Sequence, residues 1–203
     1  MDKQTEEILQ KIEEAEYVLV GLGQEFDMEF FLQSREDYRR IREELQQQNV
    51  LWLLPYVEEQ FRRQYLPEME AEIEKGLQKL AKVLEKKSYF VVSSSLNHKL
   101  AEVPWKKMLL KKERFVAPCG DWTKKQCPDG CEEGIQTVTE ADEEQLQESF
   151  KKLQTNGFSV PDLGKCPKCG KKLVLNNVYA GRYDEKGYLK TWTEYQNWLQ
   201  NTL

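Results

Sequence analysis

The chain has 203 residues, which is enough for one domain or for one domain with a small module. Its 30 Lys and Arg against 35 Asp and Glu leave a net charge of −5, which argues against non-specific binding of nucleic acid. Its longest apolar run falls far short of the roughly 20 residues that cross a bilayer, and its N-terminus lacks the pattern of a secretory signal. We therefore expect a cytoplasmic protein whose partner is neither a membrane nor nucleic acid.

The N-terminus predicts a helix followed by a strand. Thr5–Ala15 has the apolar spacing of an amphipathic helix with Thr5 as its N-cap, and Tyr17–Val20 resembles a short buried strand. The strand leads into Gly21-Leu22-Gly23, a G-x-G turn typical of the opening of nucleotide-binding α/β domains. An isolated turn of this kind is a weak signal.

Residues 28–87 predict a helical insertion and not a strand–helix repeat. Ser34 is a candidate cap for a helix over 35–48, and Pro67 suits the first turn of a later helix. Two or three helices are expected to pack against the sheet through Tyr38, Ile41, Leu45, Leu77, Leu80 and Leu84.

Two further strands and two helices complete the expected order. Tyr89–Ser93 predicts a buried strand that leads into a polar run, and Arg114–Ala117 predicts a weaker one. Thr139 begins a helix with a capping-box pattern, and Gly157 is its expected stop. The expected divisions are 1–118 for the core with its insertion, 119–181 for a zinc-binding module and 182–203 for a C-terminal amphipathic helix.

Two cysteine pairs are the strongest signal in the chain. Three residues separate Cys127 from Cys131, and two separate Cys166 from Cys169, so each pair can present two thiolates on a tight turn. Four thiolates complete the tetrahedral site that Zn²⁺ prefers and leave no open position, so the metal would be structural. Reduced cysteines without metal and an iron–sulfur centre are the alternatives. Without a secretion signal, a disulfide framework is not expected.

The fifth cysteine and the single histidine limit the chemistry that the chain can perform. Cys119 would need a base or a positive neighbourhood to act as a nucleophile, and His98 supplies the one imidazole that could be a base or a ligand. The alternatives are an inert, half-buried thiol at Cys119 and a His98 ring that is exposed or satisfied within the fold.

The order of these features resembles the sirtuin family: a strand into a glycine turn, a helical insertion, a strand into a polar run, an x-C-G-D turn and two zinc knuckles. The resemblance covers the chain up to about Gly181 and is most specific over Tyr89–Cys169. It implies a Rossmann-like NAD domain with a structural zinc module. It also implies an enzyme that uses NAD to remove acyl groups from lysine or to transfer ADP-ribose.

The family's motifs can be placed on this sequence residue by residue. Its T-Q-N-I-D-G motif falls on Ser93–His98, and its His-Gly pair falls on Cys119-Gly120. The resemblance thus implies cofactor-binding positions at Gly21, Gly23, Ser93, Ser95 and Asn97, and candidate catalytic positions at Cys119, Ser95, Asn97 and His98.

Several departures from the family fall on those same positions. Ser95 and Asn97 replace an Asn and an Asp, and Cys119 replaces the His that deprotonates a ribose hydroxyl. In the glycine turn, Leu22 adds bulk and Glu25 adds a carboxylate where a phosphate would bind. The sequence ends before the further strands whose turns bind the adenosine half of NAD in the family.

Three interpretations follow. The first is a catalytically impaired sirtuin-like protein with structural zinc, residual NAD or ADP-ribose affinity, and a protein or acyl-lysine peptide as partner. The second is a divergent active sirtuin, a deacylase or ADP-ribosyltransferase with rearranged residues. The third is an unrelated zinc-ribbon interaction module. The expected fold is α/β: a partial Rossmann-like parallel sheet with a helical insertion and a zinc-ribbon module.

Overall fold

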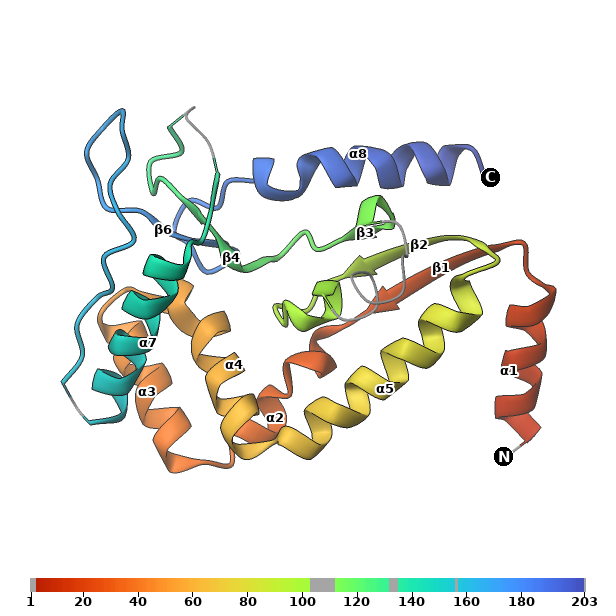
Figure 1. Ribbon diagram of the computed structural model, residues 1–203, viewed down its shortest axis with the longest axis horizontal. Helices are drawn as coiled ribbons and strands as arrows, with labels where there is room; N and C mark the ends of the chain where they lie inside the picture. The colour runs from red at the N-terminus through yellow and green to blue at the C-terminus, as the bar shows by residue number, and fades with distance from the viewer. Residues whose placement is uncertain (1–2, 103–111, 132–134, 156, 203) are drawn as a thin grey trace.

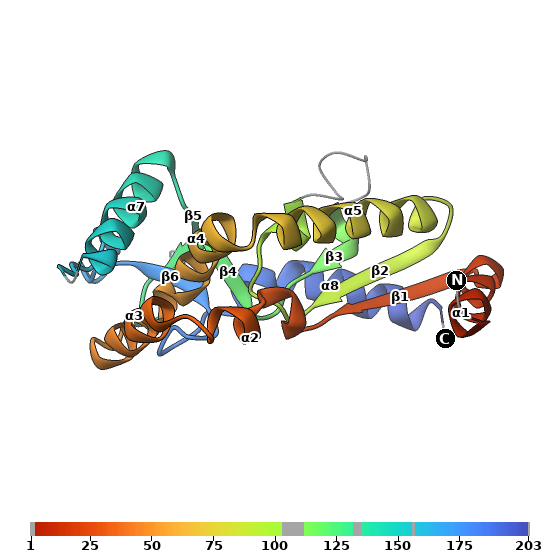
Figure 2. The same ribbon diagram turned by 90° about the horizontal axis from the view of Figure 1, so that it is seen from below.

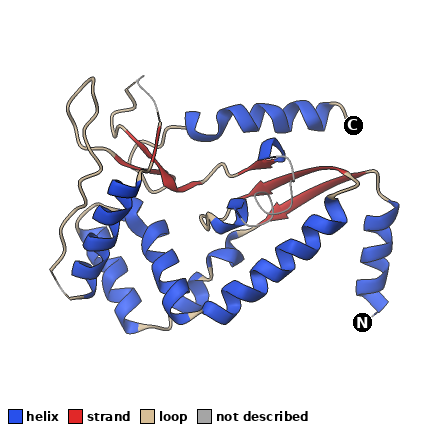
Figure 3. Cartoon of the chain, viewed as in Figure 1, coloured by secondary structure: helices blue, strands red, loops and turns tan. Residues whose placement is uncertain are grey.

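In the part of the chain that the structure describes, two sheets of three strands form the framework of a mixed α/β protein (Figures 1 and 3). The computed structural model describes residues 3–102, 112–131, 135–155 and 157–202. The parallel sheet has the order β1 (Tyr17–Leu22), β2 (Ser88–Ser93) and β3 (Phe115–Val116). The antiparallel sheet has the order β5 (Gln136–Thr137), β4 (Gly120–Gln126) and β6 (Val174–Asn177).

The first strand is longer than the sequence pattern predicts. β1 continues past Val20 because Gly21 and Leu22 pair in parallel with the last two residues of β2. Gly21 therefore belongs to the strand and not to a turn. The helix before it, α1 (Lys3–Glu14), begins ahead of Thr5, so Thr5 lies in its first turn and is not its N-cap.

The segment between β1 and β2 is largely helical, as expected. Its elements are η1 (Gln24–Asp27), α2 (Glu29–Leu32), α3 (Glu36–Gln47), η2 (Leu51–Leu53), α4 (Leu54–Tyr65) and α5 (Pro67–Leu84). Pro67 occupies the first turn of α5, where its missing N–H costs no hydrogen bond. Ser34 does not cap α3, because its hydroxyl donates to the carbonyl of Phe31 and Arg35 is the N-cap.

Helices cover both faces of the parallel sheet (Figure 2). On one face, α5 packs Leu77 into the same cluster as Val91 of β2. On the other face, α8 (Lys186–Gln200) packs Trp198 into a cluster with Phe90. Burial of both faces is the usual requirement of a parallel sheet, and it explains why β2 is a nearly continuous apolar run.

We expect Leu84→Ala to lower the free energy of unfolding by about 2–5 kcal/mol, because Leu84 is fully buried in the cluster between α5 and the sheet. Leu80→Ala should cost less, since Leu80 is only partly buried. Urea unfolding of both variants measures the difference. A larger loss from Leu80→Ala would contradict this packing.

A second core lies among the helices and the antiparallel sheet. Tyr38, Ile41 and Leu45 of α3 are fully buried there, and not against the parallel sheet as the sequence led us to expect. They share this cluster with α4, with α7 (Glu140–Gln154) and with Leu175 of β6. Helical periodicity identifies the buried face of α3, but it carries no information on which element covers that face.

The predicted start of α7 is confirmed in detail. Thr139 accepts a hydrogen bond from the backbone N–H of Asp142, and the Asp142 carboxylate accepts one from the N–H of Thr139 at 2.8 Å. This reciprocal pair is a capping box. The helix ends at Gln154, before Gly157, whose N–H donates to the carbonyl of Lys152.

Membrane insertion depends on the length and the apolar composition of helices. Within the described residues, none of them has both the length and the apolar composition that a membrane span requires.

Candidate metal centre and strand-end site

Two tight turns bring the four predicted cysteines together. Cys127 and Cys131 follow β4, and Cys166 and Cys169 precede β6, the strand that pairs with β4. Each turn contains a glycine with positive φ, Gly130 in the first and a second one directly after Cys169. Strand pairing therefore delivers the two halves of the cluster to one place.

The spacing of the sulfur atoms fits a metal ion. All four Sγ atoms lie within 4.8 Å of one another, and those of Cys127 and Cys169 are 3.5 Å apart. A tetrahedral site with metal–sulfur bonds of about 2.3 Å requires sulfur atoms about 3.8 Å apart. Cys127 and Cys166 are buried, whereas Cys169 is exposed. The four cysteines can thus hold one metal ion at the edge of the second core.

The loop that follows β2 forms hydrogen bonds with a buried carboxylate, that of Asp27 in η1. One oxygen of Asp27 accepts hydrogen bonds from the Ser95 hydroxyl and from the backbone N–H groups of Leu96, at 2.8 Å, and Asn97, at 3.1 Å. The Asn97 amide donates to the carbonyl of Phe26 at 3.1 Å. The structure therefore brings Ser95 and Asn97 together, but their donors are already satisfied by the segment after β1.

The space beside this loop is small and acidic. A cavity of about 60 Å³ is lined by Asp27, Glu29, Glu58 and Cys119, among others. Burial raises the pKa of the half-buried Cys119 thiol, and the nearby Asp27 carboxylate raises it further. Cys119 is therefore a protonated thiol at neutral pH, which agrees with the inert alternative.

In the predicted glycine turn, the backbone N–H of Gly23 is already hydrogen-bonded to a nearby carboxylate. The N–H of Gly23 donates to a carboxylate oxygen of Glu25 at 3.2 Å, and a Cβ at Gly23 would collide with that side chain. The donor that a phosphate would use is thus directed at a carboxylate.

His98 lies in a different environment from Cys119. Its Nδ1 is 2.6 Å from Glu59, its Nε2 is 3.1 Å from Glu102, and the indole N–H of Trp122 also donates to Glu59. The ring is 7% exposed, so it is satisfied within the fold. Burial lowers the pKa of His98, but the carboxylates of Glu59, Asp121 and Glu102 together outweigh burial and hold that pKa above its usual value.

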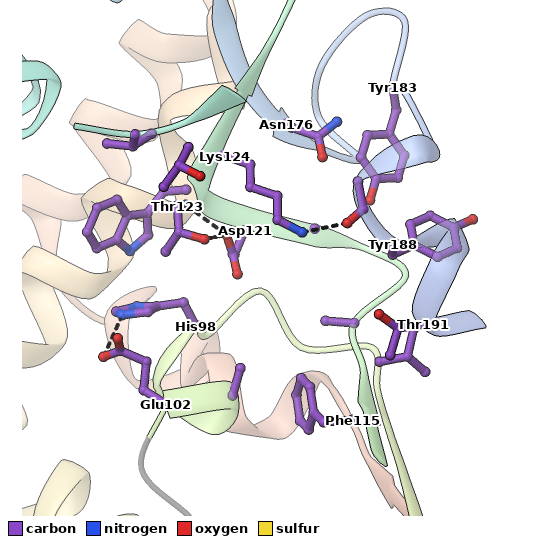
Figure 4. A pocket seen from close by; sticks show the side chains of 18 of the residues that line it. His98, Glu102, Phe115, Asp121, Thr123, Lys124, Asn176, Tyr183, Tyr188 and Thr191 are labelled. Carbon is purple, nitrogen blue, oxygen red and sulfur yellow. Dashed lines mark hydrogen bonds and ion pairs between the residues drawn. The ribbon is translucent and has the colours of Figure 1, made fainter. Parts of the chain in front are cut away.

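His98 also borders a larger cavity, which we call the β4–α8 cavity. It has a volume of about 440 Å³. Its wall is formed by the turn after β2, by β3 and β4, and by the first turn of α8, with His98, Glu102, Phe115, Asp121, Trp122 and Tyr188 among the lining residues (Figure 4). Cys119 is not part of this wall, so the structure does not join the one imidazole to the unpaired cysteine.

Several buried acids were missed by sequence reasoning, among them three that lie near the predicted site residues. Asp27, Glu58 and Glu59 are each less than 10% exposed. For the last two, the sequence carried a signal: they interrupt the apolar run Leu51–Phe61, in which adjacent carboxylates are expensive to bury without partners. Asp27 carried no comparable signal, because its partners lie about 70 residues away.

Comparison with known proteins adds no assignment. No protein-family model matches the sequence, and no curated protein matches it significantly.

We expect the protein to lose stability as the pH rises from about 5 to 8. Burial raises the pKa of Glu58 from 4.5 to about 7, although the Tyr38 hydroxyl donates to it at 2.7 Å. The unfolded state therefore releases this proton first, so the contribution of Glu58 is complete below its unfolded pKa and is lost as the pH approaches about 7. The loss is on the order of 3 kcal/mol.

Chemical unfolding at several pH values tests this expectation. Glu58→Gln should flatten the profile, whereas Glu36→Gln, on an exposed position of α3, should leave it unchanged. Burial likewise raises the pKa of Asp27, which adds a change in the same direction. A native profile that rises from pH 5 to 8, or a Glu58→Gln profile as steep as the native one, would contradict the assignment.

Proposed function

We propose that this chain is a sirtuin-like protein that has kept a structural zinc module and lost NAD-dependent catalysis, and that it acts by binding a partner. The observation that carries the proposal is the position of Asp27. Its carboxylate accepts the hydrogen bonds of the loop on which the family's T-Q-N-I-D-G motif falls. In this proposal the parallel sheet is the remnant of a Rossmann-like fold.

The chemistry of the cysteine cluster favours zinc. Four thiolates at tetrahedral spacing suit Zn²⁺, and no oxygen or nitrogen ligand joins them among the described residues. Such a closed site leaves no position for a substrate or a water molecule. We therefore assign the ion a structural role, in which it fixes the two cysteine turns against the second core.

The residues at the strand ends do not fit NAD. A cavity of about 60 Å³ is far below the roughly 300 Å³ of a small ligand site, and Asp27, Glu29 and Glu58 line it. The pyrophosphate of NAD is an anion, and the glycine turn presents the Glu25 carboxylate to it. Like charges repel in this partly buried place, so cofactor binding is opposed before any chemistry begins.

An exposed apolar surface beside this closed site supports a binding role. Phe30 and Phe31 of α2 are 83% and 47% exposed, and Val178 and Tyr179 after β6 are 46% and 36% exposed. Glu29, Val178 and Tyr179 line the same small cavity, so these two segments are neighbours. Contiguous exposed apolar side chains mark sites of protein contact. A protein, or a peptide that carries an acyl-lysine, is the partner class that we assign to this surface.

The proposal predicts no measurable NAD-dependent deacylation. The test is nicotinamide release from NAD in the presence of an acyl-lysine peptide, with NAD affinity measured in parallel by calorimetry. Cys119→His should not restore turnover, because a general base alone contributes about 10²–10⁴-fold and the cofactor site remains closed by Asp27. Robust release by the native chain that is abolished in Cys119→Ser would instead establish the divergent enzyme.

A further inference from the structure

The β4–α8 cavity has the properties of a ligand site and no part in the proposed function. Its volume of about 440 Å³ is in the range of small-molecule pockets. Phe115, Trp122 and Tyr188 contribute aromatic walls, and His98 and Asp121 bring polar atoms to its edge (Figure 4). Aromatic walls with a few converging polar groups are how sites for small molecules are built.

The nitrogen donors around the cavity already have acceptors. Both ring nitrogens of His98 face carboxylates, and the indole N–H of Trp122 donates to Glu59. The side-chain amide of Asn176 donates to the carbonyl of Asp184 at 2.9 Å. An anionic ligand would therefore have to displace hydrogen bonds that the fold has formed.

The amino end of α8 is satisfied in the same way. The N–H of Lys186 donates to the Asp184 carboxylate at 3.1 Å, and the N–H of Gly187 donates to the Asp184 carbonyl at 3.3 Å. The ammonium of Lys124, which is exposed, donates to the carbonyl of Gly187. The helix end thus offers little to an anion, although helix N-termini often bind one.

The cavity wall instead contains a negatively charged group, the Asp121 carboxylate, that can accept a further hydrogen bond. One oxygen of Asp121 accepts hydrogen bonds from the N–H and the hydroxyl of Thr123, at 2.7 and 2.6 Å. The other oxygen has no hydrogen-bond partner among the residues that the structure describes. Glu102 and Glu143 also border the cavity, so the part of its wall that the structure describes has three carboxylates against two basic side chains, His98 and Lys124.

We propose that the β4–α8 cavity binds a small organic cation, an amine whose ammonium group donates to Asp121 while its apolar body packs against Phe115 and Tyr188. A hydrogen bond between an ammonium group and a carboxylate is about twice as strong as one between neutral groups. The aromatic faces attract the same positive charge. The cavity is lined neither by Asp27 nor by its partners in the loop after β2, so this proposal can be tested independently of the proposed loss of catalysis.

Benzylamine is a suitable probe, with benzyl alcohol and benzoate as neutral and anionic counterparts of the same shape. Isothermal titration calorimetry measures affinity, and NMR of the Trp122 indole signal reports on the site. We expect saturable binding of benzylamine, at least tenfold weaker binding of benzyl alcohol and no binding of benzoate. Equal affinity for the amine and the alcohol, or no saturable binding of the amine, would overturn the proposal on the native chain alone.

Variants then locate the contact. Asp121→Asn keeps an oxygen for Thr123 but removes the charge, so it should weaken benzylamine binding about tenfold or more. Tyr188→Leu should weaken it several-fold through loss of the aromatic face. Glu72→Gln, on the exposed surface of α5, should leave affinity unchanged. Unchanged affinity in a folded Asp121→Asn variant would place the amine elsewhere.

Discussion

Replacing Cys166 with serine should prevent metal binding and unfold the half of the protein that contains the second core. Cys166 is 3% exposed and belongs to the same buried cluster as Leu163 and Leu173. Structural zinc contributes an apparent ~10–16 kcal/mol to folding in zinc-finger peptides, which is comparable to the ~5–15 kcal/mol that stabilise a whole domain. The loss of one ligand should therefore remove more free energy of folding than this half of the chain has to spare.

Metal analysis and thermal unfolding measure the two parts of this expectation. The native chain should carry about one zinc ion, and Cys166→Ser should carry much less and lose its cooperative transition. Cys119→Ser is the matched control: it removes a sulfur atom outside the cluster and should retain both metal and transition. Full zinc occupancy in Cys166→Ser would show that these four cysteines are not the ligand set.

The four-cysteine cluster could be predicted from sequence because the information that specifies it is local. Each cysteine pair lies within five residues, and tight turns containing Gly130 and Gly170 fix the geometry of each pair. That the two pairs meet required only that the strands beside them pair, as β4 and β6 do. The start of α7 was predictable for the same reason, since its capping box involves residues three apart.

The strand-end site could not be predicted in this way. Asp27 lies in a short 3-10 helix with no periodicity of its own, and its partners follow a strand about 70 residues later. The sequence resemblance indicated that Ser95 and Asn97 depart from a motif. It could not indicate that a carboxylate from the segment after β1 accepts hydrogen bonds from these two residues.

The second large effect is expected from replacing Glu59, which should lower the free energy of unfolding. Its buried carboxylate forms ion pairs with His98 and with the partly exposed guanidinium of Arg63. It also accepts a hydrogen bond from the indole N–H of Trp122. Removing one partner from a buried charged group costs about 3–5 kcal/mol, because the remaining groups keep their desolvation and lose their acceptor. We therefore expect Glu59→Ala to lower the free energy of unfolding by that amount. Glu72→Ala, which removes an exposed ion pair with Lys75, should leave the free energy of unfolding nearly unchanged.

The same pair should be visible in the titration of His98, which is the only histidine and therefore gives a single set of ring signals by NMR. Burial raises the pKa of Glu59, but the interaction with His98 lowers it, and the net effect is a lowered pKa. The pKa of His98 is raised above 6.5. The stability that His98 contributes is thus complete below about pH 6.5 and is lost as the pH rises through its folded pKa. The stability that Glu59 contributes is lost as the pH falls below its unfolded value of 4.5.

Glu59→Gln separates the charge from the packing of this side chain. The variant keeps the volume of the side chain and an oxygen for Trp122, but it removes the charge that holds the proton on His98. Burial then acts on the imidazole with only the Asp121 and Glu102 carboxylates to oppose it, so the pKa of His98 should fall below its native value. The chemical shifts of the ring protons, followed against pH, measure that fall directly. A His98 pKa that is unchanged in a folded Glu59→Gln variant would mean that the two side chains are neighbours without being an ion pair, and the cost of Glu59→Ala would then have to come from lost packing alone.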